Sequence, residues 1–435
     1  MYQRQPQEPI ALNPVWNWHD FTNRAQQITQ QLRQQNVRAA ALWIEDAAMF
    51  ACAFLACINA KTTVLLPPTL LPENLAWIDE NTELFFTDDN IHQFGLQQQI
   101  TQNSPIIDRT SQTEIWLKTS GSSGEPKILI KTAEKMWQES DAISQSLPFR
   151  RGSHIHLLGS VSAQHHYGLS YRVILPLKMG WTIGRKQCLY PESLIEESLC
   201  ADQSVWISSP ALLTRLNLAL PELNHIHLQG ILSSGGALPE DTAAELRHVL
   251  KCDVIEGYGS TETGVIGFRA DAGLWQPTPV TTIGQNDEGA LWVEAPWLDR
   301  REQTADAVEI IDGKFKLLGR IDRIVKFGDK RISLVKIEQD LLRHPWIADC
   351  YIAQHPIYQR PAAWVALSAV GIEQFRREGR LKTLHQLKHY LTATQEHAGL
   401  PRYWRFGTEL PRNSQSKISR TDFEHVFLNP KEENF

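Results

Sequence analysis

The chain has 435 residues, enough for one large domain and a smaller one, and its 42% hydrophobic and 21% charged residues are typical of a folded, soluble protein. The formal net charge of −6 is unevenly spread: residues 320–435 hold 19 Lys and Arg against 13 Asp and Glu, a net +6, which leaves −12 for residues 1–319. The positive part has no basic run and no aromatic RNA-binding motif, so we do not expect a nucleic acid partner. Charge alone leaves open whether this part meets an anionic partner or shows ordinary surface variation.

The cysteines and the apolar segments indicate a cytoplasmic protein. The six cysteines are scattered, with no CxxC pair and no Cys/His ligand spacing, which is typical of reduced thiols. The first 14 residues lack the apolar core of a signal peptide. The most apolar stretch, residues 47–60, is too short to span a bilayer and predicts a buried helix.

Short apolar runs alternate with helical patterns over the first three hundred residues. In chain order, the pattern predicts strands at 39–46, 62–67, 203–209, 229–234 and 252–259, and helices at 47–60, 210–220 and 238–250. Strands separated by helices favour an α/β fold in which helices cover parallel-rich sheets. We therefore predict a large α/β domain over residues 1–319.

The pattern changes near residue 308. Residues 308–318 contain two short apolar runs around Asp312 and Gly313, a strong signal for a hairpin. The remaining chain predicts strands at 348–353 and 362–370 and helices at 335–344 and 384–397. This mixture predicts a small α+β domain over residues 320–435, with the junction near residues 320–323.

The stretch TSGSSGEPK, residues 119–127, is the first candidate for ligand binding. It is no Walker loop, because Lys127 follows Gly124 by three residues and precedes a strand-like run instead of a helix. Glycines would let backbone N–H groups converge on an anion, and the Thr and Ser hydroxyls would add donors. Taken alone, the stretch predicts either a phosphate site or a mobile linker.

Other polar segments follow in a fixed order. SSGGALPED (233–241) and EGYGSTETG (256–264) lie at the ends of successive predicted strands, where α/β sheets gather their ligands. TADAVEI (304–310), residues 319–338 and PRNSQSKISR (411–420) come next. Together with the glycine-serine loop, these segments resemble the AMP-forming, adenylate-forming superfamily of acyl-CoA and aryl-CoA synthetases, nonribosomal adenylation domains and luciferases. The resemblance extends from about residue 39 to residue 427.

The resemblance implies a site for ATP and Mg²⁺. Residues 119–127 would close over the β- and γ-phosphates, residues 235–237 would lie along the adenine, and Tyr258 would stack on it. Thr261 would bind the α-phosphate, Glu262 would hold Mg²⁺, and Asp306, with Arg320 nearby, would bind the ribose hydroxyls. The implied nucleotide-binding residues are Thr119, Ser120, Gly121, Ser122, Ser123, Gly124, Lys127, Gly235, Gly236, Ala237, Glu256, Gly257, Tyr258, Gly259, Ser260, Asp306 and Arg320.

The resemblance also implies two half-reactions. Lys417 matches the lysine that bridges the acid and AMP, and it would act with Thr261 and Glu262 as a catalytic group. Asp322 matches a hinge about which the small domain swings after adenylation, bringing residues 326–334 to a thiol channel. The segment with His165, Tyr167 and Gly168 matches one that lines the acid pocket. The His165–His166 pair has no third ligand at useful spacing, so we do not expect zinc.

The expected thiol acceptor is the phosphopantetheine of CoA or of acyl carrier protein, both of which are anionic. The C-terminal sequence is most similar to that of stand-alone ligases of bacterial aryl-polyene and fatty-acid-like gene clusters. This resemblance implies a 4-hydroxybenzoate-like aryl acid as the first substrate candidate and a medium-chain acyl acid as the second.

Three departures from the family pattern favour an alternative. Ala305, Asp329 and Ser416 stand at or near positions where relatives have glycine. They leave open a catalytically impaired relative that binds nucleotide or acyl ligands as a regulatory module. Lys417, Glu262, Asp306 and the complete glycine-serine loop favour the enzyme.

Overall fold

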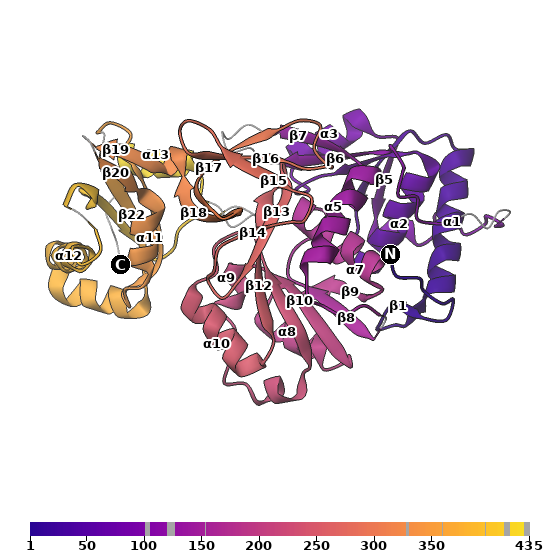
Figure 1. The fold of residues 1–435 in the computed structure, drawn as a ribbon, viewed down its shortest axis with the longest axis horizontal. Coiled ribbons are helices and arrows are strands. Elements are labelled where there is room, and N and C mark those ends of the chain that lie inside the picture. The colour runs from indigo at the N-terminus through magenta and orange to yellow at the C-terminus, as the bar shows by residue number, and fades with distance from the viewer. Residues whose placement is uncertain are drawn as a thin grey trace. The chain divides into compact units, whose positions relative to one another are not determined.

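The computed structural model describes residues 1–100, 105–119, 127–152, 154–327, 330–358, 360–395, 397–412 and 418–429. Packing divides the chain into two units (Figure 1). The first unit contains Met1–Ile283, Val293–Glu302 and Asp312–Phe315, and the second contains Gly284–Trp292, Gln303–Ile311 and Lys316–Phe435. The sequence predicts a boundary between residues 319 and 320 that separates two domains able to move relative to each other. The division into packed units does not test this motion, so the boundary stays a prediction.

A nine-stranded sheet forms the centre of the first unit. Its strands run in the order β14 (Gln276–Pro277), β13 (Gly264–Ala270), β12 (Asp253–Ser260), β11 (Leu228–Ser233), β10 (Gln203–Ser208), β8 (Ile155–Gly159), β9 (Thr182–Gln187), β1 (Pro9–Ala11) and β2 (Trp16–Asn17). From β12 to β1 all neighbours are parallel, whereas β13, β14 and β2 are antiparallel to theirs. The carboxyl ends of β10, β11 and β12 therefore share one edge.

A second sheet of the first unit carries the glycine-serine loop between two of its strands. Its order is β5 (Leu84–Thr87), β3 (Ala39–Trp43), β4 (Thr63–Leu66), β6 (Glu114–Thr119) and β7 (Lys127–Thr132). Only β7 is antiparallel to its neighbour, and Thr119 pairs with Lys127. The described strands thus bring together the two ends of the loop.

Helix α2 (Ala47–Ala60) joins the two sheets. Residues 47 to 58 are all buried, and the helix packs against β3 and β4 on one side and β9 on the other. The prediction of a buried helix is confirmed, and no described helix is long and apolar enough to cross a membrane. Figure 1 shows α2 beside α1 (Trp18–Gln34).

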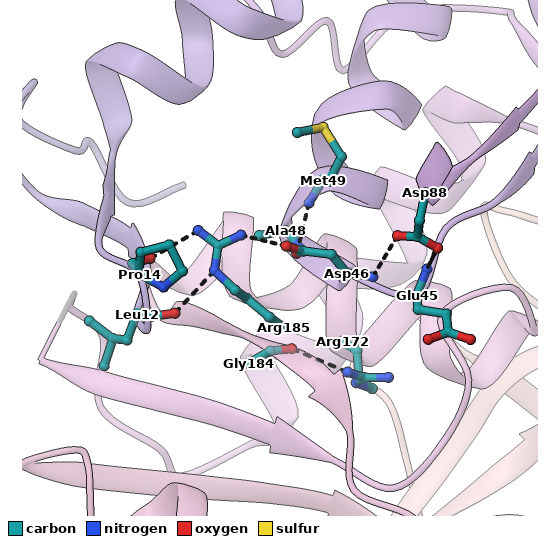
Figure 2. A network of polar contacts seen from close by, with 10 residues as sticks. All are labelled: Leu12, Pro14, Glu45, Asp46, Ala48, Met49, Asp88, Arg172, Gly184 and Arg185. Atoms are coloured by element: carbon teal, nitrogen blue, oxygen red, sulfur yellow. Dashed lines mark hydrogen bonds and ion pairs between the residues drawn. The ribbon is translucent and has the colours of Figure 1, made fainter. Parts of the chain in front are cut away.

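A polar clamp fixes the start of α2 and the N-terminal segment to β9 (Figure 2). Asp46 caps α2 by accepting hydrogen bonds from two backbone amides of its first turn, at 2.9 and 3.1 Å. The same carboxylate pairs with Arg185 Nη1 at 2.6 Å. Arg185 also donates to the carbonyl oxygens of Leu12 and Pro14, at 3.1 and 3.0 Å. One guanidinium thus connects three segments that are far apart in the sequence.

The remaining helical segments of the first unit are mostly short. They are α3 (Pro72–Asn81), α4 (Asp88–Ile91), α5 (Ala133–Ser146), α6 (His166–Gly168), a π-helix at Leu169–Ile174, α7 (Leu175–Met179), α8 (Pro191–Ser198), α9 (Pro210–Leu213), a 3₁₀ turn at Pro221–His225 and α10 (Glu240–Leu250). The predicted helix at 210–220 is too long. Helix α9 ends at Leu213. Beyond it, the Arg215 and Leu216 amides donate to carbonyls only three residues back, and Asn217 accepts from the Ala219 amide, so turns follow in place of further helix.

Strands β15 (Thr282–Gln285), β16 (Ala290–Glu294), β17 (Glu302–Ile311) and β18 (Lys314–Arg320) form a four-stranded sheet whose residues divide between the two units. The predicted hairpin at 308–318 is confirmed by the neighbouring strands β17 and β18. Asp312 and Gly313 connect them with φ values of +49° and +76°. Two successive positive φ angles are what a tight hairpin turn requires.

The rest of the second unit is the predicted α+β mixture. It contains a 3₁₀ turn at Ile321–Arg323, β19 (Ile324–Phe327), β20 (Lys330–Ser333), α11 (Leu334–Leu342), β21 (Ile347–Gln354), β22 (Pro361–Leu367), α12 (Ala369–Leu391), a 3₁₀ turn at His397–Gly399, β23 (Tyr403–Gly407) and α13 (Arg420–Leu428). The predicted strand at 362–370 ends early because Ser368 caps α12 by accepting from the Gly371 amide at 3.1 Å. Helix α12 also begins before the predicted residue 384, and it is kinked at Gly379, where φ is +78°.

Candidate active site

A cavity of about 360 Å³ opens within the first unit, beside the turn that follows β12. Strand β7 contributes Lys131, helix α5 contributes Lys135, and the turn contributes Thr261 and Glu262. The segment before β17 adds Arg300. The sequence therefore brings two predicted catalytic residues to a cavity that three cationic side chains also line.

The turn that carries Thr261 and Glu262 is held by hydrogen bonds on both sides. The Ser260 amide donates to the Thr263 hydroxyl oxygen at 3.0 Å, and the Thr263 amide donates to the Ser260 hydroxyl oxygen at 3.2 Å. From outside, the Trp297 indole donates to the Thr263 carbonyl oxygen at 2.8 Å. This fixed backbone presents an exposed Glu262 carboxylate at the cavity, with Thr261 partly buried beside it.

Close packing of the strands around the turn depends on glycine. A Cβ atom at Gly259 would lie 2.2 Å from the carbonyl oxygen of Gly264, so no side chain fits there. Gly264 itself has a φ of +66° and faces the Trp297 indole. The predicted glycine positions of this segment thus shape the turn.

A buried ion pair ties helix α5 to the strand that leaves the turn. Glu139 lies 3.0 Å from Nε2 of His166 and accepts a hydrogen bond from the Val265 amide at 2.9 Å. Burial opposes ionisation of Glu139, but His166, Lys131 and the Val265 amide outweigh it and lower the pKa of this carboxyl. The pair supports the turn from inside the fold.

The two segments predicted to contact adenine lie next to each other. The Ser234 hydroxyl donates to the Gly257 carbonyl oxygen at 2.8 Å, and Glu256 accepts from the Leu238 amide at 3.0 Å. The other oxygen of the buried Glu256 carboxylate accepts from Arg269 Nε at 2.8 Å. Residues 235–237 are therefore anchored beside the end of β12, and the Glu256 side chain takes part in that anchoring.

Tyr258 belongs to an aromatic cluster in the first unit. Its ring centroid lies 5.4 Å from that of Trp275 and 5.7 Å from that of Phe315. Tyr258 is partly exposed, and residues 235–237 are exposed. A Cβ atom at Gly235 would meet nothing within 4 Å, so there is open space beside this backbone. A flat ring held next to open backbone suits the stacking of a nucleobase.

The segment predicted to line the acid pocket contacts the same sheet edge. The Tyr167 hydroxyl donates to the Ser208 carbonyl oxygen at 2.9 Å and lies 3.2 Å from the Leu232 carbonyl oxygen. A Cβ atom at Gly168 would lie 1.8 Å from the Ser162 carbonyl oxygen, so the chain passes too close for a side chain. His165 is partly buried, and this burial lowers its pKa.

Comparison with known proteins agrees with this arrangement. Residues 96–290 match the family model of AMP-binding enzymes. The chain is 28% identical over 329 residues to a 4-coumarate–CoA ligase of Halorhodospira halophila, covering 72% of this chain and 77% of that protein. Its fold matches ATP-bound MatB from Rhodopseudomonas palustris with a TM-score of 0.81, at 16% identity over 98% of this chain and 97% of the other. The chain is thus similar to AMP-binding enzymes, with the family match lying in residues 96–290.

A further relative is named for a different acceptor. The chain is 27% identical over 348 residues to a D-alanine–D-alanyl carrier protein ligase of Staphylococcus haemolyticus, covering 69% of each protein. The relatives of this chain thus include both a CoA ligase and a carrier protein ligase. The predicted resemblance to the adenylate-forming superfamily is confirmed.

Some of the predicted site residues lie outside the described part of the chain. Thr119 and Lys127 end strands β6 and β7, but Ser120, Gly121, Ser122, Ser123 and Gly124 are not among the described residues, and neither is Lys417. Their roles stay predictions.

Asp306, Arg320 and Asp322 belong to the second unit. Asp306 lies on β17, where its amide donates to the Thr304 hydroxyl oxygen at 3.1 Å, and Arg320 ends the neighbouring strand β18. The backbone of Asp322 lies in the 3₁₀ turn between β18 and β19. The two units are described separately, so the ribose-binding and hinge roles stay predictions.

The charges that line the cavity fit a magnesium–polyphosphate ligand. Two carboxylates at the rim are paired: Asp299 with Lys135, and Glu302 with Arg300 at 3.5 Å. Glu262 has no hydrogen bond or ion pair with any described residue. A single carboxylate that works together with phosphate oxygens is the usual protein contribution to a Mg²⁺ site.

Sequence reasoning missed Lys131 and Glu139, and it considered His166 only as a possible metal ligand. Their burial depends on contacts between segments far apart in the chain, so no local motif marks them. Only Lys131 could have been found from the sequence. Residues two and four apart on a strand share a face, so Lys131 lies on the same side of β7 as Lys127.

Proposed function

We propose that this protein is an ATP-dependent acid–thiol ligase. A carboxylate oxygen of the acid would attack the α-phosphorus of ATP, releasing pyrophosphate and leaving an acyl-adenylate. A thiolate would then attack the acyl carbonyl carbon, form the thioester and release AMP. Both partners of the first step are anionic, so catalysis needs positioning and cationic stabilisation of the transition state.

One observation carries the proposal: a turn held by hydrogen bonds presents Thr261 and Glu262 at a cavity whose charged lining consists of three cations and three carboxylates. The turn continues directly from β12, whose Tyr258 belongs to the aromatic cluster beside residues 235–237. The proposed sites for a nucleobase and for phosphates would therefore lie on consecutive parts of one segment. The family match over residues 96–290 supports the same assignment.

The proposed roles in adenylation follow the family pattern. Glu262 would hold Mg²⁺, which neutralises phosphate charge when bound, and Thr261 would donate to the α-phosphate. Residues 119–127 would close over the outer phosphates. Lys417 would approach the acid and the α-phosphate as a mobile point charge. Asp306 and Arg320 would bind the ribose.

The proposed second half-reaction uses the hinge at Asp322. Rotation there would withdraw Lys417 and bring residues 326–334 to the thiol, so that one site serves both steps. The net charge of +6 on residues 320–435 suits an anionic phosphopantetheine acceptor. Acyl carrier protein is our first candidate, in line with the carrier protein ligase among the relatives, and CoA is the second.

The proposed acid is an aryl carboxylate of the 4-hydroxybenzoate type. The 4-coumarate–CoA ligase among the relatives and the aromatic Tyr167 and Tyr171 near the predicted pocket support an aryl acid. A medium-chain acyl acid is the alternative.

The decisive experiment measures pyrophosphate release with ATP and Mg²⁺ over a panel of aryl and straight-chain acids. Hydroxylamine traps the adenylate as a hydroxamate, so adenylation is read without knowledge of the acceptor. We expect release with one class of acid. Lys417→Ala should lose most of it, about 10²-fold or more, while ATP still binds, because the lysine acts mainly in the transition state.

Two outcomes would contradict the proposal. Acid-independent release that Lys417→Ala leaves unchanged would indicate a contaminating ATPase. ATP binding without hydroxamate formation from any acid, even with holo carrier protein present, would favour the regulatory module that Ala305, Asp329 and Ser416 suggest. With an active acid in hand, CoA and holo carrier protein tested separately identify the acceptor.

A further inference from the structure

Lys131 is a mostly buried lysine. No described residue forms an ion pair with it. Its side chain is 7% exposed, on a strand whose neighbouring Ile128 and Ile130 are 44% and 50% exposed. The ammonium group has no hydrogen bond or ion pair with any described residue. Lysine is seldom buried to this extent. Because Nζ of Lys131 keeps some exposed area and the residue lines the cavity, the ammonium group is open to a ligand there. A cation in such a position suits an anion.

The strongest attraction on Lys131 comes from Glu139, ahead of Glu262 and Glu302, but the Glu139 carboxylate already has partners. One oxygen pairs with His166 and the other accepts from the Val265 amide. Burial lowers the pKa of Lys131, and attraction from Glu139 opposes this only in part. Glu139 therefore favours a charged Lys131 at longer range without making the direct contact.

The other charges of the cavity point to a ligand. Lys135 and Arg300 are paired with Asp299 and Glu302, so their charges are compensated within the fold. What remains on the described lining is the Lys131 ammonium and the exposed Glu262 carboxylate, which attract each other without forming an ion pair. An anion that brings its own divalent cation would use both groups at once.

The cavity is separate from the predicted nucleobase site, and its lining combines the charged groups with the apolar side chains of Leu129, Ile130, Trp297 and Leu298. The aromatic cluster of Tyr258 does not line it, whereas the turn of Thr261 and Glu262 does. Lys131 lies four residues beyond Lys127, on the face of β7 that continues from the end of the glycine-serine loop. Cations are thus placed both at the end of that loop and inside the cavity.

We infer that Lys131 binds a phosphate of the polyphosphate end of ATP, and of the pyrophosphate product, from inside the fold. The inference rests on the proposed function and adds to it a phosphate-binding residue beyond the glycine-serine loop. In this role Lys131 contacts the leaving group, so it affects pyrophosphate and ATP but not AMP.

The test measures binding of inorganic tripolyphosphate and of AMP, each with Mg²⁺, by calorimetry on the full chain. Lys131→Met should weaken tripolyphosphate at least tenfold and change the Kd of AMP less than twofold. Lys131→Arg, which keeps the charge, should recover most of the affinity. Lys118→Met, on the neighbouring strand β6 and outside the cavity lining, is the matched control and should change neither ligand.

Three results would overturn the inference: no tripolyphosphate binding by the wild type, equal binding by Lys131→Met, or equal weakening of tripolyphosphate and AMP. The last result would mean that Lys131 only supports Glu139. If Lys131→Met does not fold, Lys131→Gln, which keeps a polar group in the cavity, replaces it under the same criteria.

ATP–pyrophosphate exchange with an active acid separates this inference from the proposed function. In the variant we expect the KM for pyrophosphate and for ATP to rise, with the KM for the acid unchanged. Tripolyphosphate binding that depends on Lys131, without exchange for any acid, would retain the inference and remove the proposed function. Exchange with the same KM for pyrophosphate in wild type and variant would retain the proposed function and remove the inference about Lys131.

Discussion

The end of strand β12 and the turn that follows it use their acidic residues in opposite ways. Glu256 is buried, and its two oxygens accept from Arg269 and the Leu238 amide. Glu262, six residues later, is exposed at the cavity and has no such contact with any described residue. Both were predicted to bind the nucleotide or its metal. Their surroundings give the first a structural task and leave the second available for a ligand.

This difference suggests a criterion for sorting the charged groups of the first unit. Groups that stabilise the fold are paired within it, as Glu139 is with His166, because an unpaired buried charge is costly. Groups that serve a ligand keep their bonding capacity until the ligand arrives. Lys131 is the strongest test of this criterion, because it combines deep burial with the lack of a short-range partner among the described residues.

Glu262→Gln should produce the largest effect and should act on activity alone. The amide removes the charge that would hold Mg²⁺, so we expect kcat/KM for hydroxamate formation to fall by about 10²–10³-fold, or about 3–4 kcal/mol. The free energy of unfolding should change by less than about 0.5 kcal/mol, because the side chain is exposed. A loss of stability with intact activity would reverse the roles assigned to the two carboxylates.

Much of this contrast could not be predicted from the sequence. The motif EGYGSTETG predicted that Thr261 and Glu262 lie at the end of a strand, and they do. It could not reveal that Glu256 pairs with Arg269, because a pair across two strands depends on their register. Lys131 was missed for a similar reason. The segment 297–302, more than 160 residues later, lines the cavity with it, and local patterns do not register such distant contacts.

The fold was more accessible to sequence reasoning, within limits. Apolar runs with clear ends predicted β10, β11 and β12 to within a residue or two. The predictions were wrong where a cap or a local bond decides the structure. Ser368 begins helix α12 inside a run that looks like a strand, and turns follow helix α9 where the pattern predicted further helix.

The criterion also predicts that a buried ionisable group without a charged partner stays neutral. His156 provides a test of this prediction. It is 3% exposed, its Nδ1 lies 2.8 Å from the Thr182 hydroxyl, and burial lowers its pKa to about 4. The unfolded chain, with an ordinary histidine pKa of about 6.5, binds more protons between these values. Stability is therefore full above pH 6.5 and falls as the pH falls towards 4, by about 3 kcal/mol between pH 7 and pH 4.

The check for His156 is the pH dependence of urea unfolding. His156→Gln keeps a hydrogen-bonding group but cannot take up a proton, so the loss on acidification should shrink by that amount. Equal slopes for wild type and variant would mean that other groups carry the acid sensitivity.

Glu256→Gln should act on stability and not on catalysis, which is the reverse of Glu262→Gln. The amide can accept with only one of its two ends, so its NH₂ group must face either Arg269 or the Leu238 amide, both of which are donors. We expect a loss of about 2 kcal/mol in the free energy of unfolding. A raised KM for ATP at unchanged stability would instead place Glu256 in contact with the nucleotide.

Arg185→Lys should give the smallest effect, and it extends the criterion to a region far from the cavity (Figure 2). Lysine keeps a charge for Asp46 but cannot reach the Leu12 and Pro14 carbonyls at the same time, since it lacks the planar fork of arginine. We expect a loss of about 1 kcal/mol in urea unfolding, with hydroxamate formation unchanged.

Arg38→Lys is the matched control for Arg185, because Arg38 pairs with Glu83 at 2.9 Å while its side chain is 88% exposed. Exposed ion pairs contribute little, so its effect should stay below about 0.5 kcal/mol. Equal losses for the two variants would show that lysine disturbs this fold wherever it replaces arginine. A loss confined to Arg185 would show that the number of partners within the fold, and not the presence of an ion pair as such, distinguishes a structural charge from one left for solvent or ligand.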